Sequence, residues 1–313
     1  MDRGREFADA ELKRLEKEFA AVYAQAEREV QEKLEEHLRK FEKKDVLMRK
    51  KVERGELSKS AYKRWRTSQI LTGKEWEKLR DDIAYRYTVA YKDAADAINT
   101  GVMGVYAESI NFSTFAIESC AAIETRYMLY DLDTVKNLIA KQPNLLPLKE
   151  VDGRKVERWN RRKVASAVTQ GILQGEGTKG IAKRLRVVTG MNRKSSVLNA
   201  RTSITSAESS GRMIAYKRAE SMGLSIEKQW LAIHDHRTRH THRVYDRMVL
   251  PLDGEFAPDL KYPGDDSADP SEVYNCRCRL VGVIDGRAVE LSADTVDGMS
   301  YDEWKAAKPR RAA

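Results

Sequence analysis

Cysteine and proline are scarce in this chain of 313 residues, which has three cysteines and seven prolines. Cys120 is isolated, and the other two cysteines, Cys276 and Cys278, are separated by a single residue. This spacing excludes the disulfide framework of small secreted proteins and favours a reducing compartment. Proline is absent from residues 148–250, which predicts a mostly helical middle. Four of the seven prolines then fall within residues 251–270, which predicts short strands and loops there.

Long apolar runs are missing as well. No stretch approaches the roughly 18 apolar residues that cross a membrane. The charged start, MDRGREFADAELKR, lacks the apolar core of a signal peptide. We therefore expect a soluble product that is made or assembled inside a cell and has no membrane partner.

Acidic residues are almost absent between Arg154 and Arg201, where 13 Lys and Arg stand against Glu157 and Glu176 alone. The local net charge is +11, so the rest of the chain carries about −2 of the total of +9. Such a segment suits a phosphate backbone or an acidic protein surface, and the alternative is a set of ordinary solvated helix faces. Trp159 is its only aromatic residue, which speaks against single-strand binding by base stacking. The candidate residues for binding DNA or a protein partner are Arg154, Lys155, Arg158, Arg161, Arg162, Lys163, Lys183, Arg184 and Arg186.

The first third of the chain has a helical pattern. Apolar residues recur in steps of three and four over residues 7–52, which contain no glycine or proline. This predicts an amphipathic helix, long enough to form a coiled-coil-like arm. Gly55 ends it, and Ser58 or Ser60 can cap a second, short helix. Residues 72–75, TGKE, have the spacing of a capping box and are expected to open a third helix.

Glycine and proline positions predict where the chain divides. Gly101 and Gly104 are expected to interrupt the next apolar stretch, which resumes to about Leu132. Pro143, Pro147 and Gly153 then predict a linker. Three helices are expected after it, followed by short strands and loops packed on the last one. The predicted helices cover residues 159–175, 178–191 and 195–223, and the predicted domains are a helical region with a long arm (1–142), a linker (143–153), a module of basic helices and a strand/loop unit (154–284) and a tail (285–313).

Histidine and cysteine gather in residues 226–283. Four of the five histidines fall between His234 and His242, and Cys276 and Cys278 follow. In an extended strand, residues two apart share a face, so both cysteines, and likewise His240 and His242, can point to one place. A tetrahedral zinc site needs about four nitrogen, sulfur or oxygen ligands and can stabilise a small unit that lacks a core. The candidate ligands are Cys276, Cys278 and His242, with Asp235, His240 or His234 as the fourth.

Two other interpretations of this cluster stay open. One is a hydrogen-bonded core in which Asp235 pairs with Arg237 or Arg277 and Asn275 bonds nearby backbone. The other is a disulfide between Cys276 and Cys278, whose very small ring has poor geometry.

An enzyme is a weaker hypothesis. Asp235 and His236 suit a metal-dependent nuclease that acts on a phosphodiester. No histidine follows His242, so a second downstream ligand or base of that kind is missing. No Ser-His-Asp arrangement supports a hydrolase. The sequence therefore favours a protein that is not an enzyme.

An ordered series of motifs resembles a known family. ARTSITSAESSGR is followed by KQWLAIHDHRTRHTHRVYD, a loop with phenylalanine, proline and glycine, and YNCRC. This series, over about residues 160–284, resembles the Mu F-like phage minor head proteins, also described as the head morphogenesis family of tailed phages. The family often has asparagine where Glu208 stands, and its glycine after the His242 position is delayed here to Gly254. The positions that carry the resemblance are Arg201, Thr202, Glu208, Trp230, Asp235, Arg237, Thr238, His242, Asn275, Cys276, Arg277 and Cys278.

The resemblance implies a structural minor head protein present in few copies near the portal. Such a protein takes part in head assembly and, in some phages, accompanies the DNA. The expected partners are the portal protein, the major capsid or scaffold protein and double-stranded DNA. The expected location is the head interior or portal vertex of a virion assembled in the host cytoplasm. The alternatives are a metal-dependent packaging nuclease and a DNA-binding accessory protein. The expected fold is mainly α with a small C-terminal α+β module.

Overall fold

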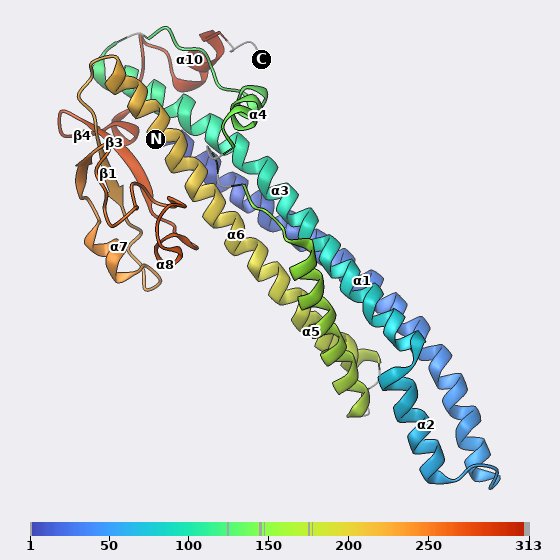
Figure 1. Ribbon diagram of the computed structural model, residues 1–313. Helices are drawn as coiled ribbons and strands as arrows, with labels where there is room; N and C mark the ends of the chain where they lie inside the picture. The colour runs from blue at the N-terminus through green and yellow to red at the C-terminus, as the bar shows by residue number, and fades with distance from the viewer. Residues whose placement is uncertain are drawn as a thin grey trace. The chain divides into compact units, whose positions relative to one another are not determined.

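The computed structural model describes residues 2–309 except residues 124, 144, 145, 147, 175 and 177 (Figure 1). Pro147, on which the predicted linker partly rests, and Gly175, at the end of a predicted helix, lie outside the described residues. The mainly α fold with a small C-terminal α+β module is confirmed. The elements in chain order are α1 (Arg3–Glu53), α2 (Lys59–Thr72), α3 (Lys74–Ala121), α4 (Leu132–Lys141), α5 (Gly153–Leu173), α6 (Thr178–Ser221), β1 (Glu227–Leu231), α7 (His240–Val244), β2 (Val249–Pro251), α8 (Pro270–Val273), β3 (Arg279–Ile284), β4 (Arg287–Ala288), α9 (Val289–Ser292) and α10 (Tyr301–Ala307).

The chain forms two compact units, and long helices contribute to both of them. Unit 1 comprises residues 1–16, 96–149 and 197–313, and unit 2 comprises residues 17–95 and 150–196. The domain limits expected from the sequence stay a prediction. Among the described residues, no helix is both long enough and apolar enough to cross a membrane.

The predicted arm helix is confirmed as α1, and its boundaries have local causes. Phe19, Val30 and Leu34 are separated by 11 and 4 residues, which are about three turns and one turn of a helix, and all three are buried, as the pattern requires. Gly55 follows the helix with φ of 76°, a conformation that glycine adopts without steric cost. Ser58 then caps α2, because its side chain accepts a hydrogen bond from the Ala61 backbone N–H.

Two predicted helix breaks are wrong. Gly101 and Gly104 lie inside an unbroken α3, and α6 is likewise one helix where two were expected. At Gly101 a Cβ atom would lie 2.4 Å from an oxygen of Glu11, and at Gly104 it would meet the Phe7 ring. The Glu11 side chain would have to shift to make room at Gly101, whereas the 3.6 Å separation at Gly104 is an ordinary van der Waals contact, so both glycines mark where α1 packs against α3. The helix ends at Ala121 and does not continue to Leu132.

The predicted capping box is not confirmed at its first residue. Thr72 is the last residue of α2, and nothing is described of its side chain. The third helix begins at Lys74, directly after Gly73, as the sequence predicted.

Unit 1 contains a four-stranded antiparallel sheet in the order β2-β1-β3-β4. Trp230 on β1 pairs in register with Leu280 on β3. Both side chains are fully buried in a core cluster to which α6 contributes Met213, Tyr216 and Ala219. The predicted packing of the strand/loop unit on the preceding long helix is thus confirmed. This core fixes the sheet against α6 and positions the histidine and cysteine residues.

Candidate metal centre

Three predicted ligands, His242, Cys276 and Cys278, come together in unit 1. The Nδ1 atom of His242 lies 3.6 Å from Cys276 Sγ and 3.4 Å from Cys278 Sγ. One ligand atom from each residue lies within 4.8 Å of the others, and all three side chains are buried. This His/Cys/Cys group can bind a metal ion. The two cysteines are free thiols, so the disulfide interpretation is wrong.

Helix α6 holds the cysteine segment in place. Asn275 has φ of 59°, so the chain turns sharply just before Cys276. Thr202 Oγ1 accepts a hydrogen bond from the Asn275 N–H at 2.9 Å, and Arg201 donates to the Asn275 side chain at 2.7 Å. One turn further along α6, Thr205 donates to the Cys276 carbonyl at 3.0 Å. The Arg201, Thr202 and Asn275 positions of the motif therefore anchor the cysteines to the long helix.

Asp235 lies with Arg277 and not among the three grouped ligands. Arg277 donates two hydrogen bonds to its carboxylate, at 2.6 and 2.7 Å. Thr238 and the Arg237 backbone N–H also donate to it. These contacts, those from Arg277 above all, hold the pKa of Asp235 well below its usual range. The predicted pairing of Asp235 with Arg277 is present, and this carboxylate is fully engaged within the protein.

The other histidine candidates also lie elsewhere. His240 and His242 lie on the short helix α7, where residues two apart face different directions. His240 is exposed while His242 is buried, so the expectation that they share a strand face is wrong. His234 is exposed and lies 2.9 Å from Asp246.

Two further residues complete the surroundings of His242. Glu272 on α8 places an oxygen 2.9 Å from His242 Nε2, and Thr241 donates to the same oxygen. The Trp230 ring packs edge-on against the imidazole with centroids 5.0 Å apart. Glu272 was missed from the sequence, because its approach to His242, 30 residues earlier, depends on how the loop between them folds.

The two thiols differ in acidity. Their mutual hydrogen bond lowers the pKa of Cys278 below its ordinary value, with a further lowering from His242. The same hydrogen bond raises the pKa of Cys276 well above its ordinary value, and burial adds to the effect. Cys278 is therefore the more acidic of the two thiols, and the thiolate is the form that binds metals.

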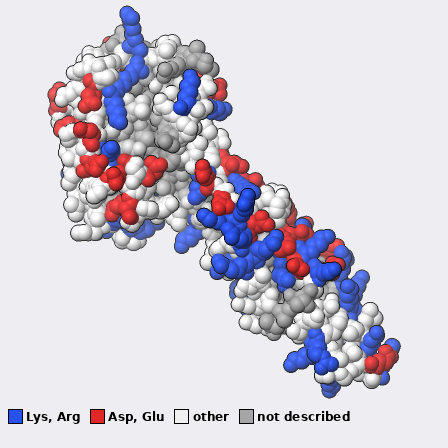
Figure 2. Space-filling view, in the orientation of Figure 1, with Lys and Arg blue, Asp and Glu red and all other residues white. Residues whose placement is uncertain are grey.

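The basic residues predicted to contact DNA or a partner lie on α5 and α6, and Figure 2 shows many exposed cations on one face of the molecule. Arg184 is held by Glu176 at 2.7 Å, and Arg161 is paired with Asp81 and Glu157. Lys163 lies over the Trp159 ring, 5.9 Å from its centroid. The remaining candidates are exposed to solvent: Arg154, Lys155, Arg158, Arg162, Lys183 and Arg186.

Comparison with known proteins relates the chain to phage head proteins. Residues 162–281 match the family described as phage Mu protein F like protein. The chain is 27% identical over 245 residues to minor head protein GP7 of Bacillus phage SPP1, covering 74% of this chain and 78% of GP7. It is also 31% identical over 159 residues to the NAD(+)–arginine ADP-ribosyltransferase EFV of Enterococcus faecalis, covering 47% of this chain and 32% of the enzyme. No solved structure matches.

Proposed function

We propose that this chain, which belongs to the Mu F-like phage minor head proteins, binds the portal protein and takes part in head assembly. Membership of the family supports a structural role in the phage head. Contact with the portal or the inner shell, and a part in packaging or ejection of DNA, are the finer points of this proposal.

The match to the phage head family carries this proposal, and the contacts of the family motif agree with a structural role. Arg201 and Thr202 bind Asn275, and Arg277 binds Asp235, all within unit 1. The polar side chains of the motif therefore bind one another and stabilise the fold of unit 1. The nuclease alternative depends on the carboxylate of Asp235, and this carboxylate forms an ion pair with Arg277. The likeness to the ADP-ribosyltransferase covers 32% of that enzyme and does not bring its activity to this chain.

Portal binding gives a direct test. The full chain mixed with the portal protein of the same phage is expected to co-migrate with it on size-exclusion chromatography, and mass spectrometry is expected to find the chain in purified heads. The major capsid protein serves as the comparison partner. If the chain binds the shell and not the portal, it should co-migrate with the major capsid protein and not with the portal protein. No complex with either, together with absence from immature and mature particles, would refute the structural role.

We further propose that the His/Cys/Cys group holds zinc. Tetrahedral zinc with bonds of about 2.3 Å to sulfur and about 2.0–2.1 Å to nitrogen places those atoms about 3.6 Å apart. The observed separations of 3.6 and 3.4 Å from His242 Nδ1 fit this edge length. Glu272 at Nε2 fits the carboxylate that commonly orients a zinc-bound histidine from its second nitrogen.

The exposed cations of α5 are proposed to contact double-stranded DNA. Each phosphate contact adds about 0.9 to the slope of log affinity against log salt. The double change Arg158→Gln/Arg162→Gln is therefore expected to lower that slope by about 2 in fluorescence anisotropy with a duplex. Binding by the unchanged chain should not depend on base sequence. If the unchanged chain shows no binding at low salt, α5 serves a protein partner or solubility.

A further inference from the structure

Helix α2 is basic in a way that costs stability. Its 14 residues include Lys59, Lys63, Arg64 and Arg66 and no acidic residue. The first turn of a helix favours acidic side chains, yet Lys59 stands there. Lys59 and Lys63 are also one turn apart on one face, where like charges repel. An arrangement that opposes both effects is expected where the helix meets an anionic ligand.

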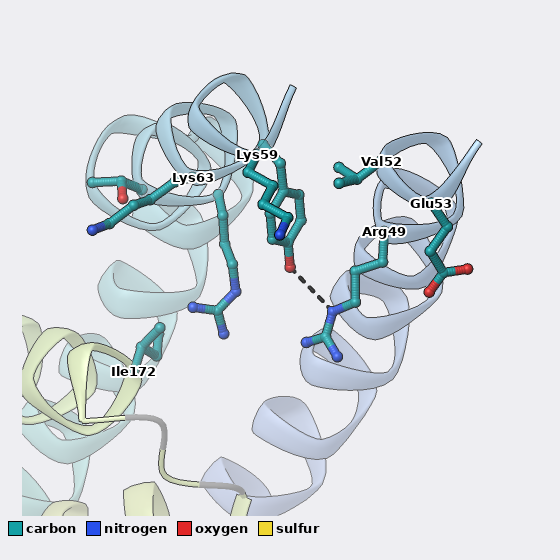
Figure 3. Close-up of a pocket in the computed structure, with 9 residues that line it drawn as sticks. Arg49, Val52, Glu53, Lys59, Lys63 and Ile172 are labelled. Atoms are coloured by element: carbon teal, nitrogen blue, oxygen red, sulfur yellow. Dashed lines mark hydrogen bonds between the residues drawn. The ribbon is translucent and has the colours of Figure 1, made fainter. Parts of the chain in front are cut away.

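A pocket of about 800 Å³ in unit 2 collects these cations (Figure 3). Lys59 and Lys63 of α2 line it together with Arg49 of α1, and Arg66 is the fourth cation. Glu53 is the only acidic residue that lines the pocket among the residues described. Lys59 and Lys63 are exposed, and the part of the chain that the structure describes provides no ion-pair partner for either.

A buried carboxylate fixes the other two cations. Asp45, on α1, is 5% exposed. It lies 2.6 Å from Arg49 Nη2 and 3.5 Å from Arg66 Nε, and it accepts a hydrogen bond from Tyr62 at 2.7 Å. Tyr62 in turn accepts one from Arg49. One buried anion thus orders two guanidinium groups beside the two exposed lysines, so the two arginines are preorganised to bind further oxygen anions.

Unit 2, which contains this pocket, also has a positive net charge as a whole. Unit 2 contains 32 Lys and Arg against 19 Asp and Glu, a net charge of +13, whereas unit 1 contains 25 against 29, a net charge of −4. A second pocket on the α1–α2 hairpin is lined by Lys44, Lys50, Lys51 and Arg54 against Glu56. Positive charge on several sides of the hairpin suits a long polyanion better than a single acidic patch on a protein.

The aromatic residues of the hairpin favour a duplex over a single strand. Trp65 stacks on Phe41 and on Tyr62, with centroids 6.2 and 6.1 Å apart. The Tyr62 hydroxyl is bound to Asp45. Unpaired bases bind proteins mainly by stacking on free aromatic faces, and these faces are engaged with each other. The hairpin therefore offers cations for phosphates and few surfaces for bases.

We propose that the α1–α2 hairpin binds the phosphate backbone of double-stranded DNA, with Lys59, Lys63, Arg49 and Arg66 contacting phosphate oxygens. The proposal rests on the contact with DNA proposed for α5 and adds a second, separate surface in the same unit. It assigns a role to a basic segment outside residues 154–201.

Anisotropy of a labelled duplex with the full chain tests this surface. The change Lys59→Gln/Lys63→Gln is expected to lower the salt slope by about 2 and to weaken binding at least about tenfold at 0.1 M salt. The control Lys136→Gln/Lys141→Gln removes the same charge from α4 of unit 1 and is expected to leave the slope unchanged. Circular dichroism checks that both variants are folded.

The variants separate this surface from the one on α5. If Arg158→Gln/Arg162→Gln lowers the slope and Lys59→Gln/Lys63→Gln does not, the hairpin proposal is wrong and the α5 contact stands. If the unchanged chain binds no duplex, both fail. Tighter binding of poly-glutamate or of a single strand than of the duplex, lost in Lys59→Gln/Lys63→Gln, would also overturn the proposal, in favour of an acidic protein or unpaired nucleic acid.

Discussion

Replacing Cys276 with serine is expected to release one zinc ion per chain and to make residues 226–284 sensitive to protease. Zinc binding contributes on the order of 10 kcal/mol to the folding of small zinc modules, because the ligands are brought together only in the folded state. His242 and Cys276 are 34 residues apart in sequence, so an ion bound by both would join the two ends of the loop region. Metal analysis of protein purified without a histidine tag and limited proteolysis measure the two effects.

Matched variants show whether the effect belongs to the metal. Cys120→Ser removes a thiol that contacts the Val289 carbonyl at 3.6 Å, away from the group, and should leave zinc and protection unchanged. Glu272→Gln keeps all three ligands and is expected to weaken zinc binding about 10- to 100-fold. A metal-free wild type whose protection survives a chelator would mean that the cluster is a hydrogen-bonded core.

The sequence predicted which residues meet at the candidate metal centre better than it predicted the secondary structure in which they lie. Cys276 and Cys278 point to one place, as the period of two requires, although they precede β3 and are not in it. His242 joins them from a helix, where that period does not apply. The residue types predicted that these distant segments belong together, because imidazole and thiolate are the ligands that zinc prefers. Residue spacing alone does not predict how a loop of over 30 residues closes. Glu272 could not be found because its position depends on that closure.

Two features of the fold were not predicted, because the sequence patterns that bear on them are ambiguous. Glycine in an apolar stretch marks either a helix break or a place where another helix packs against it, and Gly101 and Gly104 lie where α1 packs on α3. The near-neutral sum outside residues 154–201 concealed the basic α2, because acidic residues elsewhere offset it. Ser58 and the α1 periodicity were predictable because caps and apolar stripes act locally.

A buried charge network in unit 1 was also beyond sequence patterns. Arg212 is fully buried on α6, and its Nη2 donates to Asp2 and to Glu208 at 2.8–2.9 Å. Its Nη1 lies 3.8 Å from Glu290, which also accepts hydrogen bonds from Ser113 and the Gly282 N–H. Removing one member of a buried ion pair costs more than the pair itself contributes, because the remaining charge stays without a partner. The network therefore ties the start of α1, α6 and α9 into one arrangement.

The change Arg212→Met is expected to lower the free energy of unfolding by about 3–5 kcal/mol near pH 8. The difference in the free energy of unfolding between Arg212→Met and the unchanged protein should become smaller as the pH falls towards 5. Burial raises the pKa of Glu290, and the charge of Arg212 opposes that rise. Without Arg212 the pKa rises further, and an acid whose pKa is raised by folding stabilises the protein below its unfolded pKa and loses that contribution as the pH rises through the folded pKa.

Urea unfolding of both proteins at pH 8 and pH 5 measures this difference. Arg3→Met provides the control, since Arg3 is half-exposed and lies 3.7 Å from Asp302, so its loss should cost under about 1 kcal/mol at either pH. A cost for Arg212→Met no larger than that of the control would mean that the carboxylates are protonated in the folded protein. A large cost that is equal at both pH values would place the loss in packing of the arginine side chain and not in its charge.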